Sequence, residues 1–264
     1  MKGFRLTLVQ TDILWEDPEG NFKKYDHILD ACDSSDLIVL PEMFSSGFST
    51  NPSAYIKESH IRGVEWMKAA AQKTNAAICG SLIVCETEKL VNRLFFVTPE
   101  AEVFHYDKKH LFSMGGEGEF FTGGNNNITI DYRGMRIRPQ ICYDLRFPVW
   151  NRNTKYSDGS FEYDMLVFVA NWPEKRVTHW EKLLQARAIE NQAWVCGVNR
   201  IGRDGSGHDY SGSSMLVDPA GVIVASGINK QEWVHTFSID RSVIHEVKDR
   251  LPFSSDWDSF KLID

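Results

Sequence analysis

The sequence Pro-Gln-Ile-Cys-Tyr-Asp-Leu-Arg-Phe-Pro at residues 139–148 determines how the rest of the chain is interpreted. Just before it, residues 135–141 alternate between apolar and polar side chains, which is typical of a half-buried strand. Cys142 follows at the end of that strand, and the polar residues and proline after it predict a sharp turn or a short helix. Backbone N–H groups are free at such a turn. We therefore expect Cys142 to face a substrate, although cysteine more often packs in a core.

Composition favours one domain that acts on a small molecule. The chain of 264 residues is 42% hydrophobic and has no compositional break, so residues 1–264 are interpreted as a single domain. The net charge is -7 without a concentrated basic cluster, and no nucleic-acid partner is expected. No apolar run approaches the roughly 20 residues of a membrane span, and the first strand begins without a signal peptide. Five widely spaced cysteines without a CxxC pair predict a cytoplasmic protein with no disulfide framework, metal or cofactor.

Strand and helix patterns alternate along the chain, which predicts an α/β protein with mixed sheets covered by helices. Apolar residues at helical spacing predict helices at residues 22–33, 64–71 and 178–191, with a short helix from residue 241. Unbroken apolar runs predict buried strands at residues 37–40, 76–84, 164–171 and 194–199. Further strands are expected at residues 4–10, 93–98, 102–106, 128–132, 135–141, 213–217, 222–225 and 233–239.

Two segments differ from this pattern. Residues 113–127 form a glycine-rich connection in which no strand is expected, and such long connections are often functional. The C-terminal residues 251–264 carry Phe253, Trp257 and Phe260, which is a high aromatic content for a free tail. We expect this C-terminal segment to dock, on this chain or on a second subunit.

Three side chains with complementary chemistry fall at predicted strand ends, namely Glu42, Lys108 and Cys142. A thiol is mostly protonated at neutral pH, and it becomes a strong nucleophile when a cation stabilises its thiolate or a base takes its proton. Lys108 suits the first role and Glu42 the second. When a thiolate attacks an amide carbonyl, an ammonium and the backbone N–H of Tyr143 would stabilise the charge that develops on oxygen. The glycine-rich connection adds one further carboxylate, from Glu117 or Glu119.

Each of these residues also has an interpretation without catalysis. Cys142 would then pack in the core, Glu42 would be a solvated loop carboxylate after Pro41, and Lys108 beside Lys109 would belong to a solvated surface.

Taken together, the residues resemble the three catalytic motifs of the nitrilase superfamily of carbon–nitrogen hydrolases. The motifs are Leu-Pro-Glu-Met-Phe at residues 40–44, Tyr-x-Lys-x-His-Leu at residues 106–111 and Ile-Cys-Tyr-Asp-Leu-Arg-Phe-Pro at residues 141–148. The resemblance runs across nearly the whole chain. It implies an α-β-β-α sandwich of two mixed sheets flanked by helices, which usually pairs into a homodimer.

The same resemblance implies a role for each catalytic residue. Glu42 would be the general base, Lys108 rather than Lys109 the oxyanion-stabilising lysine, and Cys142 the nucleophile. The superfamily also uses a second glutamate before a turn that ends in glycine. The glycine here is Gly124. Glu117 lies at the expected distance before Gly124, and Glu119 lies two residues closer to it.

Within the superfamily, the sequences at residues 43–48, 171–173 and 186–191 resemble the omega-amidase group. This implies an enzyme that hydrolyses the terminal amide of a short chain bearing a carboxylate at its other end, such as 2-oxoglutaramate, through a cysteine thioester. Phe44, Tyr143 and Trp172 are then expected to contact the substrate, although Trp172 also fits a core position. We expect Arg187 and Glu190 to form a structural ion pair.

An acidic protein repels an anionic substrate unless its pocket supplies a local cation. Arg146, which follows the nucleophile, and Lys175 and Arg176, which follow Trp172, are the candidates for pairing the substrate carboxylate. The alternative for all three is a surface charge or, for Arg146, a partner for Asp144.

Two other functions are compatible with these residues. One is hydrolysis of an N-carbamoyl amino acid or an aliphatic amide, since the same groups serve any such C–N bond. The other is a non-hydrolytic protein that uses Cys142 as a redox sensor, which would leave Glu42 without a role.

Overall fold

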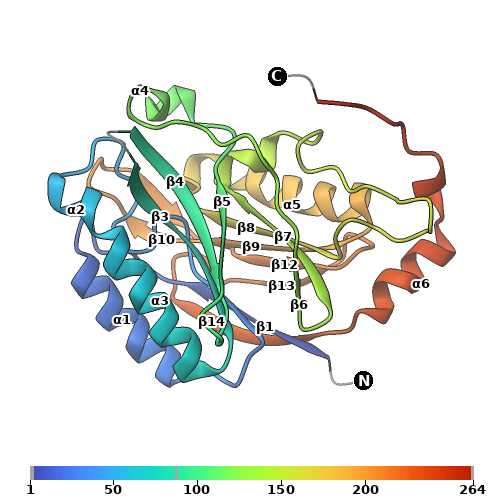
Figure 1. Cartoon of the computed structure of the whole chain (residues 1–264), viewed down its shortest axis with the longest axis horizontal. Coiled ribbons are helices and arrows are strands. Elements are labelled where there is room, and N and C mark those ends of the chain that lie inside the picture. The colour runs from blue at the N-terminus through green and yellow to red at the C-terminus, as the bar shows by residue number, and fades with distance from the viewer. Residues whose placement is uncertain (1–2, 87–88, 263–264) are drawn as a thin grey trace.

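The computed structural model describes residues 3–86 and 89–262 as a sandwich of four layers, in the order helices, sheet, sheet, helices (Figure 1). This confirms the expected α-β-β-α fold of two mixed sheets. Residues 1 and 2 of the N-terminal region and residues 263 and 264 of the C-terminal segment lie outside the described residues.

The first sheet combines parallel pairs at its centre with antiparallel pairs at its edges. Its strands in spatial order are β14 (Trp233–Ile239), β1 (Phe4–Gln10), β2 (Leu37–Val39), β3 (Ala77–Glu86), β4 (Lys89–Val97) and β5 (Val103–Asp107). Helices α1 (Pro18–Asp30) and α3 (His60–Thr74) cover its outer face, and the short α2 (Ala54–Glu58) precedes α3.

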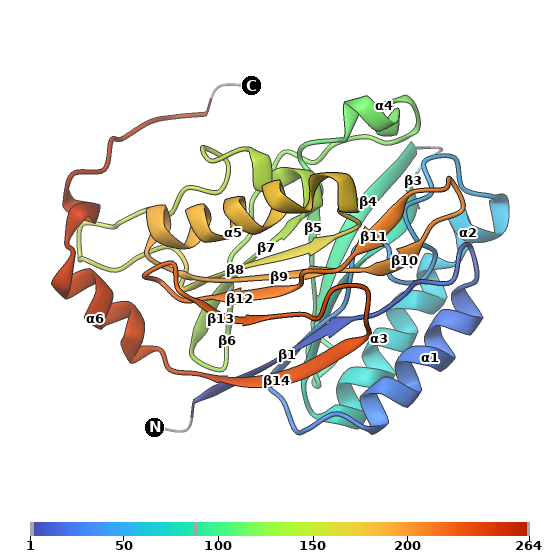
Figure 2. The same ribbon diagram turned by 180° about the vertical axis from the view of Figure 1, so that it is seen from behind.

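The second sheet has the same mixed character. Its strands in spatial order are β13 (Ile223–Ser226), β12 (Met215–Val217), β9 (Trp194–Asn199), β8 (Met165–Ala170), β7 (Met135–Ile141) and β6 (Ile130–Tyr132). Helix α5 (Val177–Asn191) lies over this sheet, as Figure 2 shows. A separate ribbon of β10 (Ile201–Arg203) and β11 (Asp209–Ser211), which sequence patterns did not reveal, lies near one end of the sandwich.

Three of the four apolar clusters among the described residues lie between the layers. The largest lies between the sheets and includes Leu6, Leu94 and Val167, the second lies under α1 and α3, and the third lies under α5. Burying each large aliphatic side chain contributes roughly 1.5–3 kcal/mol, so the double-sided burial of the central strands accounts for their unbroken apolar runs.

The predicted helices are present, with shifted ends. Helix α1 begins at Pro18 because Asp17 caps it by accepting a hydrogen bond from the Gly20 N–H at 3.0 Å. Helix α3 ends where Asn75 adopts a left-handed conformation with φ of 50°. Within the described residues, no helix is long and apolar enough to cross a membrane.

Strand β7 is a correction to the expected half-buried strand, because its polar residues Arg138 and Gln140 are buried too and Arg136 is half-buried. Arg138 forms an ion pair with Glu162 and lies over the Tyr163 ring, and Gln140 donates to Asn127 Oδ1 at 2.7 Å. The alternation of apolar and polar side chains therefore does distinguish the two faces of β7, but other parts of the protein cover both faces.

Short helical turns occupy several connections. They are α4 (Glu117–Phe120) and the 3₁₀ turns η1 (Ser113–Gly115), η2 (Cys142–Arg146), η3 (Glu174–Arg176) and η4 (Phe253–Ser255). The predicted short helix or turn after the cysteine strand is η2. As expected, Arg187 and Glu190 on α5 form an ion pair, at 2.7 Å, and Arg187 also donates to the Leu145 carbonyl of η2.

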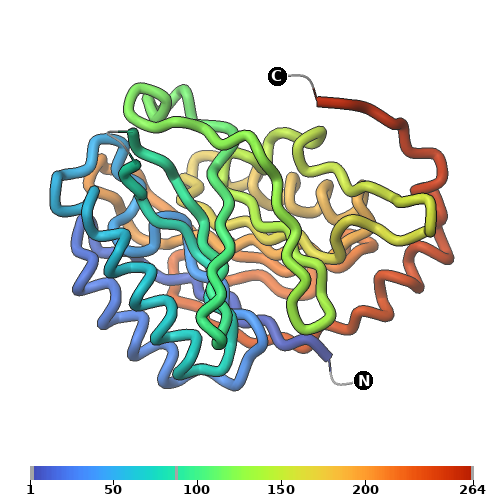
Figure 3. Tube along the Cα trace, viewed as in Figure 1, coloured from blue at the N-terminus to red at the C-terminus, as the bar shows by residue number. Residues whose placement is uncertain are grey.

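The C-terminal segment follows helix α6 (Ser242–Arg250) and leads away from the sandwich (Figure 3). Trp257 packs edge-on against Phe161, and the Arg152 guanidinium lies 4.4 Å from the centre of its ring. Phe260 and Leu262, however, are 52% and 50% exposed. Docking of this segment on a second subunit stays a prediction.

The packing of α5 on β9 generates a stability prediction. A Cβ atom added at Gly197 would lie 2.6 Å from atoms of both Leu184 and Trp180, so Gly197→Ala should lower the free energy of unfolding by about 1–3 kcal/mol. Gly118→Ala is the control because no atom lies within 4 Å of its added Cβ. Urea unfolding measures both variants, and equal stability would contradict the packing described for α5.

Candidate active site

Four of the predicted site residues come together at one end of the sandwich. Glu42 follows β2, Lys108 follows β5, Cys142 follows β7, and Glu117 begins α4. The ammonium of Lys108 lies 3.0 Å from Glu42 Oε1 and 2.9 Å from Glu117 Oε2. Strands from both sheets thus deliver their side chains to a single buried cluster.

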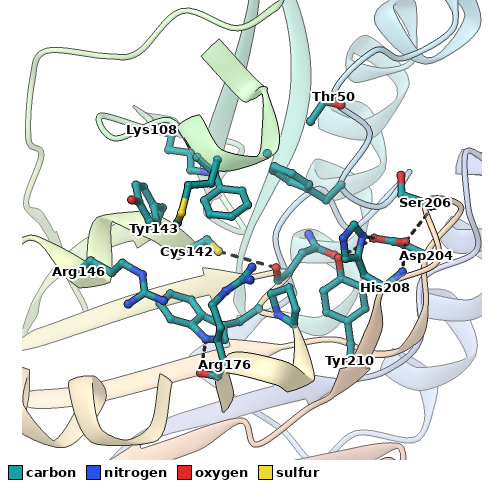
Figure 4. A pocket seen from close by; sticks show the side chains of 17 residues that line it. Thr50, Lys108, Cys142, Tyr143, Arg146, Arg176, Asp204, Ser206, His208 and Tyr210 are labelled. Atoms are coloured by element: carbon teal, nitrogen blue, oxygen red, sulfur yellow. Dashed lines mark hydrogen bonds and ion pairs between the residues drawn. The ribbon is translucent and has the colours of Figure 1, made fainter. Parts of the chain in front are cut away.

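Cys142 adopts a backbone conformation that is unusual for a side-chain-bearing residue. Its φ is 42°, in the left-handed region, at the point where β7 turns into η2. Such a conformation costs free energy and is retained where the surrounding structure enforces it, often at functional sites. Half-buried, Cys142 lines the pocket, with its Sγ 4.0 Å from the carbonyl oxygen of Asn171 (Figure 4).

The surroundings of Cys142 favour the protonated thiol. Burial and the nearby Glu42 carboxylate raise the pKa of the thiol well above its usual value, and Lys108 offsets this only in part. The cation therefore does not suffice to generate a thiolate at rest. A nucleophilic role for Cys142 would therefore require a neighbouring base that takes the thiol proton, and Glu42 is the nearby carboxylate.

Lys108 is a buried cation between two buried carboxylates. Burial opposes its charge, but the fields of Glu117 and Glu42 outweigh burial and raise the pKa of Lys108. The ammonium therefore stays charged and can stabilise an oxyanion. The pKa of Glu117 is itself raised by burial, against the opposing effect of Lys108.

Hydrogen bonds fix the orientation of the Glu42 carboxylate. Asn92 Nδ2 donates to Oε1 at 2.7 Å, and the Asn171 backbone N–H donates to Oε2 at 2.8 Å. The sequence did not predict Asn92 as a site residue. Its only signal is a polar residue inside the apolar strand β4, where a buried amide requires partners.

The structure distinguishes between Glu117 and Glu119, the two candidates for the second glutamate. Glu117 is fully buried, with both oxygens within 3.0 Å of Lys108 Nζ, and it accepts a hydrogen bond from the Phe112 N–H at 2.6 Å. Glu119 is exposed on the outside of α4. The geometry therefore favours Glu117 as the second carboxylate of the cluster.

A pocket of about 370 Å³ opens in front of Cys142 (Figure 4). Tyr143, Arg146 and Trp172 line it, as the sequence predicted for the substrate contacts. The Arg146 guanidinium lies 4.6 Å from the centre of the Trp172 ring. Asp144 is not the partner of Arg146, since the carboxylate of Asp144 binds Tyr106, His110 and the Ile141 N–H instead.

Phe44 is a correction. Its ring is fully buried among Phe22, Tyr25 and Trp66 under helices α1 and α3, and it does not line the pocket. Met43, the one residue between Glu42 and Phe44, has a φ of 45° and turns the chain away from the pocket.

The opposite wall of the pocket comes from the β10–β11 ribbon and the loop that connects its strands. Asp204, His208 and Tyr210 line this wall, and Asp204 Oδ2 accepts a hydrogen bond from the Tyr210 hydroxyl at 2.7 Å. Of the other two cationic candidates, Arg176 lines the pocket and Lys175 does not. In the described part of the chain, no cluster of three or more His, Cys, Asp or Glu residues could hold a metal ion.

Comparisons with known proteins agree with this geometry. The chain matches the carbon–nitrogen hydrolase family model over residues 5–249. It is 41% identical to the omega-amidase YafV of Escherichia coli, over 99% of this chain and 100% of that protein. It is 29% identical to the 2-oxoglutaramate amidase of Bacillus subtilis, over 95% of this chain and 96% of that protein. A CN-hydrolase superfamily protein from Xanthomonas campestris, solved with an arsenic adduct in the active site, superposes with a TM-score of 0.95 at 39% identity, over 99% of this chain and 100% of that one.

The first prediction of the site concerns the nucleophile. Cys142→Ala should abolish ammonia release from an amide while leaving the thermal unfolding midpoint close to that of the wild type, because the side chain is small and faces the pocket. With a slow substrate, peptide mass spectrometry of the wild type should find an acyl adduct on Cys142. An adduct on Cys79, Cys85 or Cys196 instead would contradict the assignment.

The second prediction concerns the buried cluster. Glu42→Gln and Lys108→Met should each lower kcat, by about 10²–10⁴-fold and 10²–10³-fold, through lost proton transfer and lost oxyanion stabilisation. Glu117→Gln should also lower kcat. Lys109→Met and Glu119→Gln are the matched controls and should be mild. Steady-state kinetics measures kcat for each variant. If kcat falls more in Lys109→Met than in Lys108→Met, or more in Glu119→Gln than in Glu117→Gln, the role belongs to the control residue instead.

Proposed function

Because the chain belongs to the nitrilase superfamily of carbon–nitrogen hydrolases, resembles its omega-amidase group and hydrolyses amides, we propose that it cleaves the terminal amide of short carboxylate-bearing amides. The proposed products are the acid and ammonia, and 2-oxoglutaramate represents the substrate class. The observation that carries this proposal is the buried cluster of Glu42, Lys108 and Glu117 directly behind Cys142.

The proposed reaction begins with attack of Cys142 Sγ on the amide carbon while Glu42 takes the thiol proton. The carbonyl oxygen becomes an oxyanion, which the Lys108 ammonium and the Tyr143 N–H stabilise. Glu42 then returns the proton to the leaving nitrogen, the C–N bond breaks, ammonia departs and a thioester remains on Cys142. A water molecule next attacks the thioester, Glu42 takes a proton from it, and the acid leaves as the thiol is restored.

The protonated resting thiol supports this route. A base next to the nucleophile is required when the thiolate is scarce at rest, and Glu42 is the carboxylate that raises the pKa of Cys142 most after burial itself. The arsenic adduct in the active site of the Xanthomonas relative is compatible with an accessible thiol there, because arsenic binds soft sulfur ligands.

Two arginines in the pocket support an anionic substrate. Arg176 lies over the Phe112 ring and Arg146 over the Trp172 ring, and in the described part of the chain neither guanidinium has an ion pair. Burial lowers the pKa of Arg146, and the charge of Arg176 lowers it further. Two cations that repel each other beside a nucleophile would both be stabilised by a substrate carboxylate.

We also propose a homodimer in the cytoplasm. The exposed Phe260 and Leu262 of the C-terminal segment would be covered by a second subunit, and the five cysteines are all free thiols, as in a reducing compartment. Sedimentation velocity tests the dimer directly.

The substrate proposal predicts a preference for acids over neutral amides. 2-Oxoglutaramate should be hydrolysed with a much lower KM than a neutral amide of the same length, because the neutral amide leaves the half-buried guanidinium charges of Arg146 and Arg176 unpaired. Arg146→Met or Arg176→Met should remove that preference. Lys175→Met is the matched control, since Lys175 does not line the pocket. The rate of ammonia release from a panel of small amides gives KM for the wild type and for each variant.

Equal turnover of 2-oxoglutaramate and the neutral amide would contradict the substrate proposal. It would not contradict amide hydrolysis itself. A preference for N-carbamoyl amino acids in the same panel would favour that substrate class instead.

A further inference from the structure

Asp144 is a fully buried carboxylate two residues after the nucleophile, and the proposed mechanism does not use it. Its oxygens accept hydrogen bonds from several donors. Oδ1 accepts from the His110 backbone N–H at 3.0 Å and from His110 Nδ1 at 2.9 Å. Oδ2 accepts from the Tyr106 hydroxyl at 2.9 Å and from the Ile141 backbone N–H at 3.1 Å. A buried charge of this kind is tolerated because donors surround it.

The donors come from the two segments that carry the catalytic groups. Tyr106 lies two residues before Lys108 and His110 two residues after it, where the chain leaves β5 of the first sheet. Ile141 immediately precedes Cys142 at the end of β7 in the second sheet. The carboxylate therefore connects the end of β5 in the first sheet to the end of β7 in the second sheet. Lys108 and Cys142 follow these two strand ends.

We propose that Asp144 is a positioning residue that holds the Lys108 ammonium in register with the Cys142 thiol. This inference rests on the proposed function in one respect, namely that this ammonium and this thiol act together on a substrate. Asp144 itself touches neither the substrate nor the reacting atoms.

The surroundings keep the donors of Asp144 in place. The Tyr106 hydroxyl accepts hydrogen bonds from Trp150 Nε1 at 2.9 Å and from the Lys109 N–H at 3.3 Å. Of the two acceptors for its own proton, Asp144 Oδ2 at 2.9 Å is closer than Gln140 Oε1 at 3.3 Å. Burial and the Asp144 carboxylate raise the pKa of Tyr106, which keeps that proton on the hydroxyl. The His110 ring stacks on Phe147 with centroids 3.7 Å apart, which fixes the direction of Nδ1.

An amide cannot replace this carboxylate, although it has almost the same shape. Each oxygen of Asp144 accepts one backbone N–H, from His110 on one side and Ile141 on the other. In Asp144→Asn, whichever position receives the NH₂ group points a donor at a backbone donor that cannot reverse its role. One of the two segments must then move away from Asp144, and the spacing between Lys108 and Cys142 changes.

The test compares Asp144→Asn with Asp164→Asn. Asp164 is also buried, and it accepts hydrogen bonds from Arg136 and forms an ion pair with Arg241. It precedes β8, at the opposite end of the parallel strands from Cys142. The control therefore reports the cost of losing a buried carboxylate far from the site. The measurements are kcat and KM for amide hydrolysis, the thermal unfolding midpoint, and the rate of Cys142 alkylation by iodoacetamide as a function of pH.

We expect Asp144→Asn to lower kcat by about 10²-fold with little change in KM, since a displacement of about 1 Å has effects of this size. The pH dependence of Cys142 alkylation should move to higher pH, because Lys108 lowers the pKa of the thiol and would be displaced. Asp164→Asn should lose stability yet retain the wild-type kcat and alkylation profile. If Asp144→Asn does not fold, Tyr106→Phe, which removes one donor, should show a smaller change of the same kind.

The inference is overturned if Asp144→Asn keeps the wild-type kcat and alkylation profile, or if it changes only KM. Equal changes in both aspartate variants would also overturn it, because loss of stability would then explain them. A wild-type protein that hydrolyses no amide would refute the proposed function instead. The alkylation profile, which needs no substrate, would still test the role of Asp144.

Discussion

The structure depends on one buried ammonium. Lys108 is 1% exposed and lies between the carboxylates of Glu42 and Glu117, which are fully buried. Removing three charges from water costs several kcal/mol for each ion, and only close contacts with good geometry offset that cost. The three residues come from separate segments of the chain, so the sandwich must bring the ends of β2 and β5 and the start of α4 together for any of these charges to be tolerated.

The fold meets this demand with rigid elements and with hydrogen bonds that fix the charged groups. Glu42 is fixed by an amide from β4 of the same sheet and by a backbone N–H at the end of β8, in the other sheet. Cys142 is held in a left-handed conformation between a buried strand and a turn whose carbonyl at Leu145 accepts from Arg187. Strain at Cys142 is thus retained because the packed layers on both sides of it leave no room to relax.

Much of the fold and the centre of the site followed from the sequence, for physical reasons that also explain what was missed. Unbroken apolar runs mark strands covered on both faces, and a carboxylate directly after such a run must lie at an edge of the sheet, which located Glu42. Asn92 and the wall formed by Asp204 and Tyr210 were missed because their contacts join residues far apart in the chain. Phe44 was misassigned because adjacency in sequence to Glu42 does not determine the direction of a side chain after a left-handed turn.

The electrostatics of Cys142 also distinguish between hydrolysis and redox sensing. Sensor cysteines are exposed thiols with a low pKa, because peroxide reacts with the thiolate. Here burial and Glu42 raise the pKa of the thiol, and Lys108 does not compensate for them. A thiol with a raised pKa is poorly suited to sensing peroxide, whereas in the proposed mechanism an amide carbonyl lies between Sγ and Lys108 and the thiol proton moves to Glu42 as the sulfur attacks. The carboxylate that disfavours a sensor role for Cys142 is therefore the group that the proposed hydrolysis uses as its base, which favours the hydrolase.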